Sequence, residues 1–244
     1  MEKKFELTDN FVINAFGIKL FQIKCTKSFK YANEGDLGGY VEKEDNLSQY
    51  GDAWVSGDAQ VYGDAQVYGE AQVYGNARVS GNVQVYGDAW VSGNAQVYGN
   101  AQVYGYAWVY GDAQVSGDAQ VYGDAQVYGN AWVYGDARVS GNARVYGDAQ
   151  VYGNARVSGD AQVYGNARVE NNHMHCGFDC FGSCNRHTHA YKTKGNKVEI
   201  TCGCFRGSLE EFEKKVEETH KGTIYEKQYK AIINLIKIKF GIDG

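Results

Sequence analysis

Apolar and polar positions recur in a six-residue unit, the hexad, over nearly half of the chain. From Gly51 to Glu170, twenty consecutive hexads follow the form Gly-(Asp/Asn)-Ala-x-Val-(Tyr/Ser) without an insertion, and four of them depart from it at a single position. Ala and Val are the constant apolar pair and lie two positions apart, so both face the interior side of a strand. The Gly-(Asp/Asn) pair is typical of a turn. This repeat predicts a β-solenoid, in which only positions four and six of each hexad face outward.

The segments on either side of the repeat have different patterns. Residues 1–50 contain short alternating runs at 5–7, 11–13 and 18–23, followed by a turn-rich link at 35–40. A stack of strands has an open end that must be covered, so we expect residues 1–50 to form an N-terminal β cap. Residues 51–170 form the solenoid, and residues 171–244 form a separate C-terminal module.

The C-terminal module begins with an irregular Cys/His-rich stretch. Two strands are expected at 187–193 and 197–202, on either side of a Lys-Gly-Asn turn. Ser208 and Glu211 match a capping box that begins the first of two amphipathic helices. We therefore predict a ββαα module that caps the rod or pairs with a second copy of itself.

Three sequence features resemble a known family. The spacing of Val and Ala is similar to the hexapeptide repeat of left-handed β-helices, which implies triangular coils of three hexads, or about 18 residues each. The leader Gly35-Asp-Leu-Gly-Gly-Tyr40 and the tail segment Cys202-Gly-Cys-Phe-Arg-Gly-Ser208 resemble parts of bacteriophage and bacterial hexapeptide-repeat proteins. Those proteins are often labelled acyltransferases from the repeat alone. The resemblance implies a left-handed parallel β-helix of about seven coils and a phage origin.

With three hexads per coil, one face of the prism carries an aromatic strip. Trp54, Trp90 and Trp108 share position four on this face, and Ser56 and Ser92 lie beside two of them. A large side chain next to a small one leaves a shallow groove with an aromatic wall. The strip either stacks on a ligand or forms a seat for a terminal module or a sister chain.

A second face brings two arginines together. Arg138 and Arg156 lie on neighbouring coils beside Ser140 and Ser158, where the tyrosines of the preceding coils stop. Like charges on adjacent strands repel, but an anion between them removes the cost, and guanidinium groups suit phosphate and carboxylate. We predict an anion seat here. The alternative is that the arginines extend into water or pair with Asp136. The third face shows no cluster that can be interpreted.

The Cys/His-rich stretch offers one metal hypothesis. Cys176, Cys180, Cys184 and His187 have spacings near those of structural zinc sites, which need four converging thiolate or imidazole ligands. The alternative is that these cysteines are ordinary buried or surface thiols. No other cofactor is expected.

Charge and composition limit the partners. The hexads hold 12 acidic residues against five arginines, which argues against binding of the nucleic-acid backbone. The N-terminus lacks an apolar signal region, and no apolar run is long enough to span a bilayer, so we expect no membrane partner. We expect a soluble, cytoplasmic protein, in the host bacterium if phage-encoded, with free thiols rather than disulfides.

These features favour binding over catalysis. Hexapeptide acyltransferases use a histidine on a loop that projects from a coil, but here no histidine precedes His173 and no loop interrupts the hexads. We predict a non-catalytic, homo-oligomeric binding protein that sequesters a small anionic ligand, for example a nucleotide-type defence signal of the host. The coil arginines would hold phosphate and Trp or Tyr would stack on the base, with further cationic contacts from Arg186, His187, Lys192 and Lys194. The alternatives are a structural or protein-docking rod and an acyltransferase.

Overall fold

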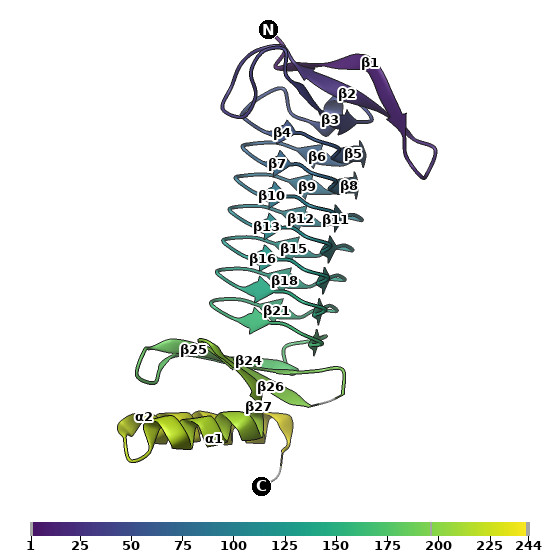
Figure 1. Ribbon diagram of the computed structural model, residues 1–244. Coiled ribbons are helices and arrows are strands. Elements are labelled where there is room, and N and C mark those ends of the chain that lie inside the picture. Colours follow the sequence, from purple (N-terminus) through teal and green to yellow (C-terminus); the bar gives the residue numbers. More distant parts are fainter. Residues whose placement is uncertain (1, 196, 243–244) are drawn as a thin grey trace.

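The computed structural model describes residues 2–195 and 197–242 and shows a rod with a different cap at each end (Figure 1). Coils of three hexads stack along the rod, as predicted, and the two chain termini lie at opposite ends. Each coil contributes one short strand to each of three faces. The solenoid strands are β4 (Trp54–Val55), β5 (Gln60–Gly63), β6 (Gln66–Val67), β7 (Gln72–Val73), β8 (Arg78–Gly81), β9 (Gln84–Val85), β10 (Trp90–Val91), β11 (Gln96–Val97), β12 (Gln102–Val103), β13 (Trp108–Val109), β14 (Gln114–Val115), β15 (Gln120–Val121), β16 (Gln126–Val127), β17 (Trp132–Val133), β18 (Arg138–Val139), β19 (Arg144–Val145), β20 (Gln150–Val151), β21 (Arg156–Val157), β22 (Gln162–Val163) and β23 (Arg168–Val169).

The three faces are parallel sheets in which every third strand is a neighbour. The first sheet runs β4-β7-β10-β13-β16-β19-β22 and the second runs β6-β9-β12-β15-β18-β21. The third contains β5-β8-β11-β14-β17-β20-β23 and continues into the N-terminal cap. The register pairs equivalent residues of successive coils, as in Trp90 with Trp108. The predicted sorting of positions four and six onto three faces is therefore confirmed.

The solenoid core consists almost entirely of the repeated alanines and valines. Ala101, Val103 and their equivalents in the other coils are buried. The glycine at each corner has a positive φ, for example +69° at Gly117, which favours glycine over any other residue. The corners of successive coils lie so close together that a Cβ on Gly117 would come within 2.9 Å of the Gly135 nitrogen.

The N-terminal cap is an antiparallel hairpin followed by a strand that starts the stack. Strand β1 (Phe5–Ile13) pairs with β2 (Lys19–Cys25), and β2 pairs with β3 (Leu37–Val41). The short runs at 5–7 and 11–13 belong to one strand with a register shift between them. The expected link at 35–40 is also mostly strand, because β3 pairs in parallel with β5 and begins the third sheet. A 3₁₀ turn (Glu44–Asn46) leads into the first coil.

The first coil exposes backbone carbonyls, and the cap supplies donors for them. Along the rod each strand amide donates to a carbonyl of the next coil, as in Gln102 N to Ala119 O, so no preceding hexad supplies donors for the carbonyls of the first coil. The Lys4 Nζ donates to Ala53 O (2.8 Å), and the Asn46 Nδ2 donates to Ala65 O (2.8 Å). Both side chains are buried. Their polar ends satisfy groups that would otherwise be unpaired in the interior.

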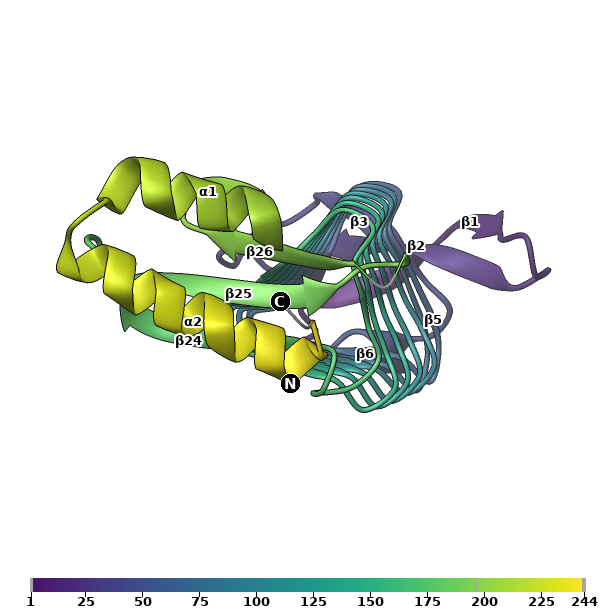
Figure 2. The same cartoon turned by 90° about the horizontal axis from the view of Figure 1, so that it is seen from below.

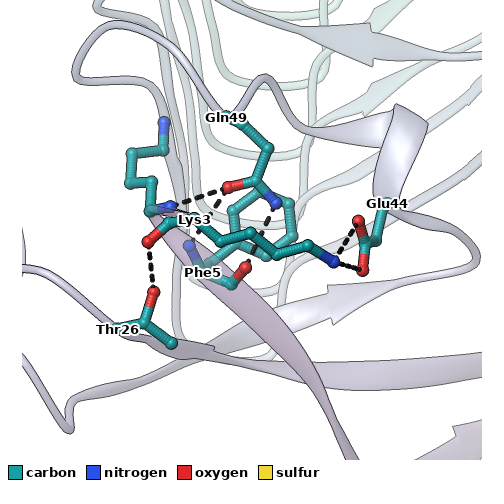
Figure 3. A network of polar contacts seen from close by, with 6 residues as sticks. Lys3, Phe5, Thr26, Glu44 and Gln49 are labelled. Atoms are coloured by element: carbon teal, nitrogen blue, oxygen red, sulfur yellow. Dashed lines mark hydrogen bonds and ion pairs between the residues drawn. The ribbon is translucent and has the colours of Figure 1, made fainter. Parts of the chain in front are cut away.

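A second polar network fastens the start of β1 to this end (Figure 3). The Gln49 Oε1 accepts from the Lys4 amide at 2.8 Å, and its Nε2 donates to Phe5 O at 3.1 Å. The Thr26 Oγ1 donates to Lys3 O, and the Lys3 ammonium pairs with Glu44. Phe5 is thereby held as a fully buried plug over the end of the core.

The C-terminal module is a four-stranded antiparallel sheet with two helices. Its elements are β24 (His175–Phe181), β25 (Arg186–Lys192), β26 (Val198–Cys202), β27 (Phe205–Ser208), α1 (Leu209–His220) and α2 (Ile224–Phe240). The predicted ββαα order is therefore incomplete, since β24 and β27 add two strands. The stretch expected to be irregular forms β24, where polar His175 and half-buried Cys176 alternate across the sheet. The capping box of Ser208 and Glu211 is confirmed.

The module's sheet lies between the solenoid end and the helices. Figures 1 and 2 show both helices on the side of the sheet that faces away from the coils. Tyr191 is fully buried and belongs to the solenoid core, which it closes at this end. The Thr193 backbone also bridges to Ala167 of the last coil. Neither helix, within the part of the chain described, is long and apolar enough to span a bilayer.

Candidate ligand-binding surfaces

The second sheet brings together the two arginines predicted to form an anion seat. Arg138 on β18 and Arg156 on β21 are directly paired in the parallel register, and both side chains are exposed. Within residues 2–195 and 197–242, neither guanidinium forms an ion pair with a carboxylate, so Asp136 does not neutralise Arg138. Two adjacent cations without an acidic partner form a region of positive potential on an otherwise acidic rod.

A tyrosine ladder ends beside this pair. Tyr68, Tyr86, Tyr104 and Tyr122 stack on successive coils with ring centroids 4.9 Å apart and nearly parallel planes. The next coil carries Ser140 at this position, so no ring of the ladder covers the far face of Tyr122. A planar group seated above Ser140 would continue the stack while its anionic substituent reached the arginines. The sequence reasoning identified the end of the ladder, but it did not assign Tyr122 a role.

Lys239 adds a positive charge near the arginine pair, and this charge was not predicted from the sequence. The Arg156 amide donates to the Asn172 Oδ1 at 2.8 Å, and the Lys239 Nζ donates to the Asn172 carbonyl oxygen at 3.2 Å. The C-terminal helix α2 therefore brings a lysine to the end of the arginine-bearing face. No sequence pattern could reveal this, because the contact depends on how the helix docks.

The aromatic strip on the first sheet divides into two parts. Trp54 is only 5% exposed and packs edge-on against Phe29, with ring centroids 5.4 Å apart, so it lies under the N-terminal cap. Trp90 and Trp108 stack with centroids 4.9 Å apart, and Trp108 is 41% exposed. These two line a hollow of about 250 Å³ together with Tyr74, Ser92 and Tyr110. Only Trp90 and Trp108 are thus available as a surface.

The four basic tail residues proposed for ligand contact do not converge. Arg186 begins β25 and lines a small hollow with Cys202 and Tyr229, while Lys192 ends the same strand. Six residue steps separate them, about 20 Å along a strand. Lys194 lies at the last solenoid corner, where its amide donates to Asn166 O (3.2 Å). His187 pairs with Asp179 instead of facing the surface. These residues therefore do not add to the arginine pair of the second sheet.

The predicted zinc site is not formed. Among the described residues, no group of three or more His, Cys, Asp or Glu side chains is placed to hold a metal ion. Cys176 packs with the cluster under the helices, whereas His187 lies on the opposite face of the sheet beside His189. Burial raises the pKa of the Cys176 thiol to about 11, which favours the protonated form. Cys180 and Cys184 are exposed on the turn between β24 and β25.

A histidine cluster occupies the junction between the solenoid and the module. The His175 Nδ1 and the His189 Nε2 lie 3.0 Å apart, and the His189 Nδ1 donates to Gln162 O at 3.0 Å. Burial lowers the pKa of His175 to about 4, with a smaller contribution from Lys239. Burial also lowers the pKa of His189 to about 3, aided by His175. Both rings are neutral near pH 7, and they hold the module on the last coil.

The third sheet carries a hollow that the sequence reasoning missed. Its volume is about 580 Å³, and its walls combine the N-terminal hairpin with three coils. The lining residues include Phe16, Ile18, Tyr62, Arg78, Ser80 and Tyr98. The signal that could have found it is the segment Arg78-Val-Ser80, since Arg-Val-Ser also occurs at both arginines of the second sheet.

The coil period, the three parallel sheets and the uninterrupted hexads define a β-solenoid repeat protein. Seven segments match a family model described as YdcK Beta solenoid repeat, at residues 71–87, 95–111, 119–135, 125–138, 137–150, 149–162 and 161–173. The repeats of this chain are therefore similar to the repeats that this family model describes. No curated protein matches the chain.

Proposed function

We propose that this β-solenoid is a non-catalytic binding protein for a small anionic ligand of the nucleotide type. The observation that carries the proposal is the pairing of Arg138 with Arg156 at the end of the tyrosine ladder. The two guanidinium groups would bind a phosphate or carboxylate, and the open face of Tyr122 would stack on a base. A phage protein of this type would act by sequestering a defence signal of its host.

The rigid backbone of the stacked sheet supports this assignment. Because the backbone that carries the site residues is already ordered, binding of a ligand would cost little free energy for ordering the site. Ser140 and Ser158 leave room beside the arginines that a tyrosine would fill. Their hydroxyl groups can donate to anionic oxygens.

The positions of the histidines favour binding over acyl transfer. All five histidines lie in the C-terminal module, and His175 and His189 are committed to its junction with the last coil. A general base has to reach the proton that it removes, within hydrogen-bonding distance or through one water. No described histidine lies on the solenoid faces that would hold an extended acyl carrier.

A thermal-shift screen followed by calorimetry tests the proposal. The probes are cyclic AMP, cyclic GMP, ADP-ribose and coenzyme A. At a concentration of 100 times its Kd, a ligand stabilises a protein by about 2.7 kcal/mol, which raises the Tm measurably. We expect a nucleotide probe to do so, and we expect Arg138→Gln/Arg156→Gln to lower its affinity at least about tenfold.

Matched variants make the result specific. Arg144→Gln/Arg168→Gln removes the same net charge from two other faces and should leave the affinity unchanged. Ser140→Tyr continues the ladder and should block stacking. The proposal fails if no nucleotide binds or if the Arg138/Arg156 variant binds as well as the wild type. Coenzyme A binding with acetyl turnover would instead indicate an acyltransferase, and capture of a protein by the rod without any ligand would indicate a docking function.

A further inference from the structure

The hollow on the third sheet is a gap in a tyrosine ladder. Strands β5 and β8 are longer than the other coil strands, and their register pairs Tyr62 directly with Ser80. Tyr98 follows on the next coil, so Ser80 is flanked by a tyrosine on each side. Tyrosines on successive coils elsewhere stack with centroids 4.9 Å apart. A missing ring between two tyrosines therefore leaves a space about as thick as one aromatic ring.

Arg78 places a positive charge at the edge of this gap. It lies two residues before Ser80 on the same face of β8 and lines the same hollow. Arg78 is exposed and, in the segments described by the structure, has no ion-pair partner. Asp58 lines the adjoining hollow on the other side of Arg78 without pairing with it. The guanidinium is thus available to an anion bound in the gap.

The N-terminal hairpin gives the gap a third wall. Phe16 and Ile18 from the turn between β1 and β2 line the hollow together with the coil residues. Figure 1 shows the hairpin extending beyond the solenoid on the side of β5 and β8. Phe16 is 76% exposed, whereas Tyr62 beneath the hairpin is 9% exposed. An exposed phenylalanine at the mouth of a hollow can cover a ligand and gain buried area when it does so.

A second gap on the same sheet lacks these additions. Ser116 is also flanked by tyrosines, Tyr98 and Tyr134, but Gln114 takes the place of the arginine. The Tyr98 hydroxyl donates to the Gln114 Oε1 at 3.3 Å. Ser116 also lies beyond the residues that the hairpin reaches in the hollow. The chain therefore contains a built-in control for the site at Ser80.

We infer that the hollow at Arg78 and Ser80 is a second ligand site, separate from the arginine pair of the second sheet. Its ligand is a planar aromatic ring that carries one anionic group. The ring occupies the space between Tyr62 and Tyr98, the anion binds Arg78, and Phe16 covers the outer edge. The chemistry fits an aromatic carboxylate or a nucleoside monophosphate.

Isothermal titration calorimetry with defined probes tests the site. The two anionic probes are naphthalene-2-carboxylate and adenosine 5′-monophosphate, and the neutral comparison is naphthalene-2-carboxamide. We expect at least one anionic probe to bind the full chain. Arg78→Gln should weaken that binding about tenfold or more while leaving the amide unaffected. Phe16→Ala should weaken all three probes. The relative affinities of the two anionic probes show whether the site prefers an aromatic carboxylate or a nucleoside monophosphate.

Substitutions of the serines decide whether the gap is the site. Ser80→Tyr fills the gap with the residue found elsewhere in the ladders and should abolish binding, while Ser116→Tyr should leave it unchanged. The inference is overturned if neither anion binds, if Ser80→Tyr binds normally, or if Ser116→Tyr loses binding equally. If Ser80→Tyr does not fold, the Arg78→Gln comparison of carboxylate and carboxamide still decides. Arg138→Gln/Arg156→Gln should bind the naphthalene probes normally, so failure here is distinguishable from failure of the proposed function.

Discussion

At the residue scale, the glycine at each corner is the position that should tolerate substitution least. Gly117 has a φ of +69°, and a Cβ there would meet the Gly135 nitrogen at 2.9 Å and its oxygen at 3.1 Å. Two separate costs therefore oppose any other residue. One is the left-handed backbone conformation, and the other is the close approach of the next coil.

Alanine substitutions separate these two costs. Gly159→Ala meets the same backbone cost, with a φ of +66°, but no atom lies within 4 Å of the added Cβ. We expect Gly159→Ala to lower the free energy of unfolding by about 1–2 kcal/mol. Gly117→Ala should lower it by about 2–4 kcal/mol, because overpacking adds to the strain. Chemical denaturation monitored by circular dichroism measures both. Equal losses would show that the corners are not closely packed.

Single residues of the repeat were predictable, while those at the ends were not. The alternation of Ala and Val alone places Val103 in the core, since period two leaves no other side for them. Trp54 occupies the same hexad position as Trp90 yet is buried, because Phe29 of the cap packs against it. A hexad carries no information about what covers it.

At the scale of elements, the two ends of the solenoid differ in their hydrogen-bonding needs. Parallel coils bond in one direction, so the first coil presents carbonyl groups and the last coil presents amides. The N-terminal cap supplies donors for the carbonyls, namely the Lys4 ammonium and the Asn46 side-chain amide. The C-terminal side supplies an acceptor for an amide, since the Asn172 Oδ1 accepts a hydrogen bond from the Arg156 backbone amide. The caps are therefore not interchangeable.

The histidine junction should make docking of the C-terminal module sensitive to acid. The pKa values of His175 and His189 lie below the ordinary value of 6.5, so the folded state favours their neutral forms. This contribution is complete above about pH 6.5 and is lost as the pH falls towards about 4. The loss is about 1.4 kcal/mol per pH unit for each ring that stays neutral. The neighbouring charged or titratable groups are Lys239, His187 and the Asp179 that pairs with His187.

Hydrogen exchange measures this effect between pH 7 and about pH 4.5. After correction for the intrinsic exchange rate, amides of β25 should lose protection on acidification, whereas coil amides such as those of β12 should keep it. His175→Gln should reduce the pH dependence, because only His189 of the pair then remains to be protonated. His220→Gln, on a histidine that stacks with Tyr229 beyond the sheet, should preserve it. A flat profile in the wild type would contradict the proposed role of the histidine pair.

Strands were harder to predict where they contain residue types that are unusual for a strand. The glycines at 38 and 39 suggested a turn, yet they lie in β3 because β3 passes close to the first coil. A Cβ on Gly38 would meet Val55 O at 2.7 Å, and one on Gly39 would meet Ala59 O at 2.8 Å. In β24 the cysteines and histidines obscured the alternation of side chains between the two faces of a strand. Their spacing suggested a metal site instead of a strand.

At the scale of the whole molecule, three hexads per coil determine which residues meet. Arg138 pairs with Arg156 only because the two occupy equivalent positions in successive coils. The faces and the arginine pair were therefore predictable once the coil length was known. The hollow at Ser80 was not, because one of its walls comes from a hairpin far earlier in the chain, whose docking no repeat pattern encodes.

Deletions test the coil length directly. Removing residues 87–104, one full coil, keeps every face in register and leaves Tyr122, Arg138 and Arg156 adjacent. Removing the single hexad 141–146 places the two arginines on different faces and brings no other two arginines into register. We expect the first deletion to retain ligand binding with a modest fall in Tm, and the second to abolish binding while circular dichroism still shows a β-rich fold. Binding by the hexad deletion at wild-type affinity would show that the arginines act independently.

The near identity of the hexads also has an evolutionary consequence. Tandem copies in a gene are gained and lost by slippage during replication, so the length of this rod can change in a single event. Only gains or losses of whole coils would leave existing surfaces intact, while partial ones would shuffle side chains among the faces and create new combinations. The same architecture thus allows a lineage either to preserve a surface while changing length or to generate new surfaces abruptly.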